Sequence, residues 1–404
     1  MPEILPADRT LEPPLRVLVI DKVSVLRSVR WRHFLVAERA NVGITLLAPT
    51  AWIENDKVIR YQSPESDPFP VVLGKVAAKG QAQRGFYLTG LIRAFRHSRP
   101  QVILMLEEGF SFFAVQIMLV RWLLARRVPI IFYNNHIASF KTFAYRLGPL
   151  YSLLSRLMIP RMTAAFCINS KAVAALQELG FQGPIVEQFY GVNDTLFVEI
   201  NKQEARKKLG LSNEENNSEV IFLFAGRLVE LKGVQDLIEA FSRLQHQRPN
   251  QAVRLLIVGR GEYEPTLRQQ AESLQLSGVA FRDVVPQEEM PYYIAAADAM
   301  VLPSRAEIDE QFGRVNVEAM LAGTPIIASN SGGIPEVIGD AGYIFQAGDV
   351  DDLLEKMLHY LDDPNTRQEQ CQRGKLRAKH RFSMDTFADA IIRMLEQVTG
   401  RGLR

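Results

Sequence analysis

The sequence predicts an α/β protein with two doubly wound domains, each built on a parallel sheet. Apolar runs of strand length alternate with longer segments of helical spacing along all 404 residues. These runs lack the strict apolar–polar alternation of half-exposed strands, which is typical of parallel strands buried on both faces. The length also favours two domains, since one domain has about 100 to 200 residues.

The first half begins with residues 1–14, MPEILPADRTLEPP, which mix prolines and acids with a single arginine. A secretory signal needs a basic start and an apolar core, so this stretch is expected to be a disordered leader. The next residues, 15–200, are predicted to form the first domain. Helical spacing in LTGLIRAFRHS and AVQIMLVRWLLARR separates runs that predict strands at Arg16–Asp21, Ile44–Pro49, Gln101–Leu106 and Val128–Asn135.

A polar stretch, Asn201–Glu219, interrupts this rhythm and predicts a domain junction. The second domain is expected over 201–384 and a returning C-terminal helix over 385–404. Its predicted strands are a run that begins at Val220, then Val253–Gly259, Val279–Val285, Ala299–Ser304 and Thr324–Ser329. Open α/β sheets bind ligands at the carboxyl ends of their strands, so two facing domains would share a cleft.

Composition excludes several classes of protein. Hydrophobic residues make up 47% and charged residues 23%, which rules out a collagen, a coiled coil and a disordered chain. The two cysteines, Cys167 and Cys371, leave no disulfide framework and no Cys-x-x-Cys metal cluster, and they fit a reducing cytoplasm. The apolar run Phe110–Val120 stops at Arg121, short of the 18 or more residues that a membrane span needs.

Charge is distributed unevenly between the halves. Residues 1–200 hold 23 Lys and Arg against 15 Asp and Glu, whereas the remainder holds 24 against 30. Residues 109–177 contain no acid at all, and their basic residues alternate with aromatic and leucine side chains. Such a surface attracts an anionic membrane or a phosphorylated acceptor, and an ordinary basic helix face is the alternative. No nucleic-acid motif accompanies the charge, so no nucleic-acid partner is expected.

Two segments of the second half carry candidate chemistry. In EQFGRVNVEA, Glu310 and Glu318 flank a helix start near Gly313, where backbone N–H groups and the helix dipole bind anions. In FAGRLVELKG, a strand ends at Gly226, and Arg227 and Lys232 follow it. Two cations between a strand end and a helix start suit a diphosphate. The spacing matches neither a P-loop nor a dinucleotide fingerprint. Taken singly, each segment is also compatible with solvent-facing charges.

Read together, these segments resemble the retaining GT-B glycosyltransferases of glycosyltransferase family 4, the group 1 transferases. The resemblance covers most of the second half through FAGRLVELKG, LLIVGRGE, VPQEEMPYYIAAADAMVLPS, EQFGRVNVEAMLAGTPIIAS and GGIPEVI. In the first half it is thinner and rests on CINSKAV, GVNDTLF and His136. It implies a GT-B fold, two Rossmann-like domains facing a central cleft, and sugar transfer without a bound metal or other cofactor.

The resemblance also implies roles for individual residues. Arg227 and Lys232 match the basic pair that binds the donor diphosphate. Glu310 matches the glutamate that approaches the donor sugar, and Glu318 the one that contacts the ribose. Sugar and phosphate would be held by the backbone around Phe312, Gly313, Arg314 and Val315. His136 follows a predicted strand and matches a position that touches donor sugar or acceptor, although a structural role is the alternative.

The sequence departs from the family pattern in two places. After the first strand, many members have a glycine pair where this chain has DKVSVLRSVRWRHF. There Arg27, Arg30 and Arg32 are candidates to contact an anionic acceptor, and packing of Trp31 under the sheet is the alternative. Asp283 stands where a glycine is usual, so the nucleotide base is not inherited. Asn316, near the donor site, is a candidate for sugar choice or an ordinary helix-face residue.

The sequence therefore predicts a retaining hexosyltransferase. Its partners would be a nucleotide-sugar donor and a saccharide or lipid-linked acceptor, in cell-envelope or exopolysaccharide synthesis. The expected location is cytoplasmic, peripheral at the inner face of the membrane through a basic N-terminal domain. Two alternatives remain. One is a GT-B phosphorylase or sugar-phosphate glycosyltransferase, and the other is a non-catalytic nucleotide-sugar sensor.

Overall fold

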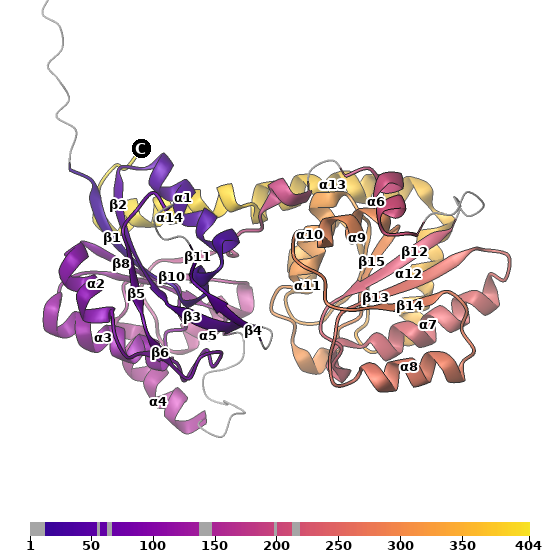
Figure 1. Ribbon diagram of the computed structural model, residues 1–404, viewed down its shortest axis with the longest axis horizontal. Coiled ribbons are helices and arrows are strands. Elements are labelled where there is room, and N and C mark those ends of the chain that lie inside the picture. The colour runs from indigo at the N-terminus through magenta and orange to yellow at the C-terminus, as the bar shows by residue number, and fades with distance from the viewer. Residues whose placement is uncertain (1–12, 55–56, 63–66, 137–147, 198–199, 212–218) are drawn as a thin grey trace, which may run out of the picture. The chain divides into compact units, whose positions relative to one another are not determined.

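The computed structural model describes residues 13–54, 57–62, 67–136, 148–197, 200–211 and 219–404 (Figure 1). The predicted leader lies outside this range except for its last two residues. The chain forms two compact units. The first comprises residues 1–167, 172–187 and 388–404, and the second comprises 168–171 and 188–387.

A seven-stranded sheet, parallel throughout, forms the centre of the first unit. Its strands, in spatial order, are β11 (Ile185–Glu187), β10 (Ala164–Cys167), β9 (Ile130–Asn134), β8 (Val102–Met105), β1 (Leu15–Ile20), β2 (Val42–Pro49) and β5 (Val71–Gly74). The four strands predicted in this half are all present. Each is an apolar run buried on both faces, as β8 shows, where Val102 to Met105 are all buried.

Helices flank this sheet, and two short hairpins extend its loops (Figure 1). The helices are α1 (Arg27–Arg39), α2 (Leu91–Ser98), α3 (Phe112–Leu124), α4 (Gly148–Met158), most of α5 (Ser170–Glu178) and most of α14 (Met384–Thr399). The antiparallel hairpins pair β3 (Ala51–Glu54) with β4 (Lys57–Arg60), and β6 (Val76–Ala77) with β7 (Phe86–Tyr87). In α3, the Ser111 hydroxyl accepts a hydrogen bond from the Ala114 N–H at 3.2 Å and so caps the helix.

The second unit has a six-stranded parallel sheet. Its strand order is β14 (Val279–Arg282), β13 (Val253–Val258), β12 (Val220–Ala225), β15 (Ala299–Leu302), β16 (Ile326–Ser329) and β17 (Tyr343–Phe345). Its helices are α6 (Lys202–Lys208), α7 (Val234–Gln247), α8 (Glu264–Ser273), α9 (Met290–Ala296), α10 (Arg314–Ala322), α11 (Ile334–Ile338), α12 (Val350–Asp362) and α13 (Pro364–Phe382). The predicted fold class, two doubly wound parallel α/β units, is confirmed.

The helical spacing of the C-terminal run His380–Val398 is interrupted at one residue. Ser383 has extended backbone (φ −68°, ψ 159°) and separates α13 from α14. Its hydroxyl accepts from the Thr386 N–H at 3.2 Å, which satisfies a free donor at the start of α14. No helix in the described part of the chain is long and apolar enough to cross a bilayer.

Candidate functional site

The candidate site of the second unit lies where β12, β15 and β16 end. β15 pairs with both β12 and β16, so the segments that follow these three strands meet at one edge of the sheet. Backbone hydrogen bonds connect them: the Arg305 N–H, after β15, donates to the Leu231 carbonyl, after β12, at 3.0 Å. The Arg305 guanidinium also holds the Asp236 carboxylate at 2.7 and 2.9 Å.

Lys232 and Glu310, both predicted site residues, lie in contact. The Lys232 ammonium donates to Oε2 of Glu310, and the Ser304 hydroxyl donates to the same oxygen at 3.1 Å. Their side chains are 13% and 17% exposed, so each reaches solvent although the contact between them fixes its position. This pair sets a cation and a carboxylate side by side at the strand ends.

The Glu310 backbone is fixed by the glycine pair of GGIPEVI. The Gly333 N–H donates to the Glu310 carbonyl at 2.7 Å, and a Cβ on Gly332 would lie only 2.1 Å from that oxygen. Gly332 also has φ +59°, a conformation that side chains rarely adopt. Glycine is therefore required there to let the loop approach Glu310.

Arg227 follows Gly226 at the end of β12 and is exposed. Within the described residues, its guanidinium has no ion-pair or hydrogen-bond partner. The Gly226 backbone lies so near the next loop that a Cβ on Gly259 would be 1.9 Å from the Gly226 carbonyl oxygen. The N–H donors of the Arg227 guanidinium are thus available to bind an anion, and the two loops at this position are tightly packed.

The helix α10 begins directly after Gly313, as the sequence predicts. Gly313 has φ +65°, and a Cβ there would lie 2.9 Å from both Leu302 and the Asn316 amide nitrogen. Arg314 is exposed and binds the Glu318 carboxylate at 2.9 Å. Burial raises the pKa of Glu318, and Arg314 opposes that rise. The free N–H groups of a helix start lie in this turn.

The other α10 candidates are less accessible. Phe312 is buried and packs edge-on against Phe382, with ring centroids 5.3 Å apart, while Val315 is half-buried. Asn316 is fully buried, and no described residue hydrogen-bonds its side-chain amide. A side chain so covered does not lie on an ordinary exposed helix face.

His136 belongs to the first unit and follows β9 there. Its N–H and carbonyl bond the Asn134 side chain at 3.3 and 3.2 Å, and its ring meets Phe110 edge-on at 5.4 Å. Burial lowers the pKa of His136 to about 4. The imidazole is therefore neutral near pH 7 and can accept or donate one hydrogen bond without carrying charge.

A second cluster of ionisable groups lies at the strand ends of the first unit. Lys22, after β1, donates from its ammonium and, at 2.9 Å, from its N–H to the Glu107 carboxylate after β8. Burial raises the pKa of Glu107 to about 7, although Lys22 opposes the rise. Glu107 was not predicted, yet it directly follows the predicted strand Gln101–Leu106, which was the available signal.

The arginines after β1 divide into buried and exposed groups. Arg30 pairs with Asp67 at 3.2 Å and Arg32 pairs with Asp21, and both arginines are buried. Burial by itself would raise the pKa of Asp21, but Arg32 and His33 hold it below its usual range. Arg30 and Arg32 therefore stabilise the fold, and of the three candidate arginines only Arg27 is exposed to an anionic acceptor.

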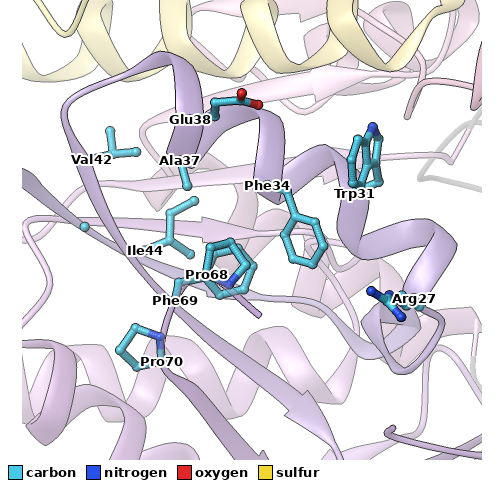
Figure 2. A pocket seen from close by; sticks show the side chains of 11 residues that line it. Arg27, Trp31, Phe34, Ala37, Glu38, Val42, Ile44, Pro68, Phe69 and Pro70 are labelled. Carbon is cyan, nitrogen blue, oxygen red and sulfur yellow. The ribbon is translucent and has the colours of Figure 1, made fainter. Parts of the chain in front are cut away.

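Trp31 does not pack under the sheet. It is 46% exposed and, with Phe34 and Phe69, lines a cavity of about 560 Å³ beside α1 (Figure 2). The Trp31 and Phe34 ring centroids are 5.8 Å apart, and those of Phe34 and Phe69 5.4 Å. Two charged residues, Arg27 and Glu38, also line the cavity.

Sequence reasoning also missed the serines that support Glu310. Ser329 donates to the Ser304 carbonyl at 2.6 Å, and Ser331 donates to the Arg305 carbonyl at 2.9 Å. Ser304 and Ser329 each end a predicted apolar run. A polar residue at the carboxyl end of a buried strand was therefore the signal that could have identified these serines. The Ser329 and Ser331 hydroxyls thus connect the segment after β16 to the segment after β15, which carries Glu310.

Among known proteins, residues 202–377 match the family model described as Glycosyl transferases group 1. A Corynebacterium glutamicum protein, GDP-mannose-dependent monoacylated alpha-(1-6)-phosphatidylinositol monomannoside mannosyltransferase, is 33% identical over 48% of this chain and 51% of its own length. D-inositol 3-phosphate glycosyltransferase of Streptomyces avermitilis is 29% identical over 67% of this chain and 61% of its own length. The alignments thus span little more than half of these relatives.

Solved structures are similar over nearly the whole chain. The crystal structure of Anabaena Alr3699/HepE in complex with UDP-glucose has a TM-score of 0.68 at 21% identity, covering 94% of this chain and 99% of that one. The shared architecture is the GT-B fold, which confirms the expectation from the sequence.

Proposed function

Residues 202–377 of this chain belong to the glycosyl transferases group 1 family, and from this premise we propose that the protein transfers a hexose from a nucleotide-sugar to an acceptor with retention of configuration. One observation carries the proposal. The open guanidinium of Arg227 and the Lys232–Glu310 pair lie in segments that follow neighbouring parallel strands. Cations there suit a diphosphate, and a carboxylate suits sugar hydroxyls.

We assign the residues as follows. Arg227 and Lys232 bind the donor diphosphate, and the start of α10 around Gly313 adds its free N–H groups. Glu310 accepts hydrogen bonds from the donor sugar, and Glu318 from the ribose. Donor binding would draw the Lys232 ammonium from Glu310 towards phosphate, which frees a carboxylate oxygen for the sugar. No metal ion is needed in this scheme, because the two cations and the helix dipole stabilise the departing charge.

Retention is explained by a front-face displacement. The bond between the anomeric carbon and the diphosphate oxygen breaks, and the acceptor oxygen bonds to that carbon from the same face. The acceptor proton passes to the leaving phosphate oxygen, so the products are the glycoside and the nucleoside diphosphate. The protein positions the reactants and stabilises charge on the leaving group, without a protein nucleophile. His136, neutral at pH 7, would orient a hydroxyl of sugar or acceptor.

We propose a lipid-linked or saccharide acceptor in cell-envelope or exopolysaccharide synthesis, at the inner face of the cytoplasmic membrane. The Corynebacterium relative is named for a phosphatidylinositol mannoside acceptor, and an Escherichia coli relative as an O-antigen chain mannosyltransferase. The basic first half of the chain supports an acceptor at an anionic surface.

Thermal unfolding with a panel of nucleotides tests the donor site. UDP, GDP, ADP and CMP are compared with their sugar conjugates, since a ligand at 100 times its dissociation constant adds about 2.7 kcal/mol to the free energy of unfolding. We expect one diphosphonucleotide to raise the melting temperature, and R227A/K232A to lose the shift. R248A is the matched control, because Arg248 is an exposed arginine that precedes β13 and is paired with Asp362. The donor assignment fails if no nucleotide shifts unfolding.

A second candidate is a transferase that acts on a soluble phosphorylated acceptor. The Streptomyces relative is named for D-inositol 3-phosphate, and the exposed Arg27 of the first unit suits a phosphate. Rapid turnover with soluble sugar or polyol phosphates and no response to added lipid would favour this candidate.

A further inference from the structure

The outward face of α3 is apolar where a surface helix is normally polar. Leu119, Trp122 and Leu123 are 56%, 57% and 63% exposed, and they lie on one face at spacings of three and four residues. The opposite face is also apolar, because Phe113, Ile117 and Val120 are buried in the core. Thirteen residues give a helix about 20 Å long, too short to cross a bilayer.

The neighbouring helix α4 repeats this pattern. Leu150, Leu153 and Leu157 are 39%, 53% and 48% exposed. The two helices pack together, with the rings of Phe112 and Tyr151 at 6.3 Å, and Figure 1 shows both along the same part of the first unit. We call the outward residues of the two helices the α3–α4 face: Leu119, Trp122, Leu123, Leu150, Leu153 and Leu157.

Three exposed arginines lie within or just after the same two helices. Arg126 and Arg127 follow α3, and Arg156 lies within α4; all three are exposed. None pairs with an acid among the described residues, and the sequence from 109 to 177 contains no Asp or Glu. Guanidinium groups beside exposed leucines and a tryptophan match the boundary between anionic headgroups and acyl chains.

We propose that the α3–α4 face docks on an anionic phospholipid bilayer, with its leucines and Trp122 entering the acyl boundary and its arginines binding lipid phosphates. A second copy of the chain is a poorer occupant, because a two-fold interface would bring the same uncompensated arginines against each other. An acidic protein would satisfy the arginines, but it would leave the six apolar side chains without an apolar partner.

The role of this docking, which is to bring the enzyme to a lipid-linked acceptor, rests on the proposed function. Docking itself is measured without donor or acceptor. The full chain is sedimented with vesicles of phosphatidylcholine alone and with vesicles that also contain phosphatidylglycerol, at low and high salt. We expect binding to the anionic vesicles that weakens with salt, since each arginine near such a surface adds about fivefold to partitioning.

Two variants separate the contributions. L119S/L123S/L153S removes apolar contact and should lower partitioning at both salt concentrations by about tenfold or more. R126Q/R127Q/R156Q should lower it by about a hundredfold on anionic vesicles at low salt only. The matched control is L376S on α13, whose leucine is 61% exposed in the other unit.

The proposal is overturned if the wild-type chain does not sediment with anionic vesicles, or if the leucine variant binds as tightly as wild type. It is also overturned if wild type forms a dimer that the leucine variant abolishes while vesicle binding is unchanged. The nucleotide-dependent melting shift, recorded on the same preparations, checks that the variants are folded. It also reports the donor site independently, so failure of docking and failure of the proposed function are distinguishable.

Discussion

Lys232 and Glu310 are 78 positions apart in the chain, yet their side chains are in contact. The Lys232 ammonium and the Ser304 hydroxyl both donate to Oε2 of Glu310. The sequence pattern identified both residues as site candidates, because each follows a predicted strand within a recognisable motif. It did not reveal that they pair, since that depends on β12 and β15 being neighbours. Strand order is set by packing of the whole unit, which local spacing does not encode.

Replacing Glu310 by Gln tests the negative charge of this side chain separately from its hydrogen bond with Lys232. The amide oxygen still accepts from Lys232, so the fold and the nucleotide affinity should be retained. The anionic acceptor for sugar hydroxyls is lost, and we expect transfer to slow on the order of a hundredfold. Release of nucleoside diphosphate measures the rate, and E307Q, which changes an exposed residue near the same loop, is the control. Full transfer activity of E310Q would contradict this role of the Glu310 carboxylate, whereas full cellular function of E310Q would favour the non-catalytic nucleotide-sugar sensor.

His136 gives a pH prediction. The unfolded chain binds a proton at this residue near pH 6.5, whereas burial lowers the folded pKa to about 4. Between these values the unfolded state holds more protons, so the contribution of His136 to the free energy of unfolding falls as pH decreases from about 6.5 to 4. NMR titration of the ring should show no protonation from pH 8 to 6 in the folded protein. A midpoint near 6.5 would contradict this, and H136N provides the assignment.

At the scale of elements, the start of α10 depends on one glycine. Gly313→Ala must hold a side chain at φ +65° and place it against Leu302 and Asn316. We expect the free energy of unfolding to fall by about 1 to 2 kcal/mol from the backbone alone, and nucleotide affinity to fall with it. Gly348→Ala is the matched control: its φ is +82°, but no atom lies within 4 Å of the added carbon. Denaturant unfolding measures the free energy of unfolding of both variants. Equal losses in the two variants would show that the positive φ alone causes the effect, without a contribution from contacts with Leu302 and Asn316.

Elements differed in how well the sequence anticipated them. Long apolar runs such as Val220–Ala225 were predicted because burial on both faces leaves a continuous signal. The strands β5, β10, β11 and β17 were missed, because each has only three or four residues. The loops that support Glu310 were missed for another reason: their glycines and serines act through contacts with distant segments. The need for glycine at position 332, for example, follows from its close approach to the Glu310 carbonyl oxygen.

At the scale of the whole molecule, the chain leaves the first unit and returns to it. Residues 388–404 belong to that unit, where the Asn41 N–H donates to the Leu403 carbonyl at 2.7 Å and Ile391, Ile392 and Leu395 are buried. A chain ending at Phe387 should therefore exchange amide hydrogens faster in β1 and β2, while its nucleotide-dependent melting shift persists. Unchanged exchange in β1 and β2 would show that the helix is dispensable to the first unit.

That return has a consequence for synthesis. A ribosome makes the β1 and β2 segments before the second unit, whereas the helix that covers part of their unit is made after residues 188–387 of the second unit. Domains generally fold as units in the order of their synthesis. Here the second unit can complete its core before α14 is available to the first unit, so the first unit finishes folding after the second. During that interval the residues that α14 will cover remain exposed to water and to chaperones.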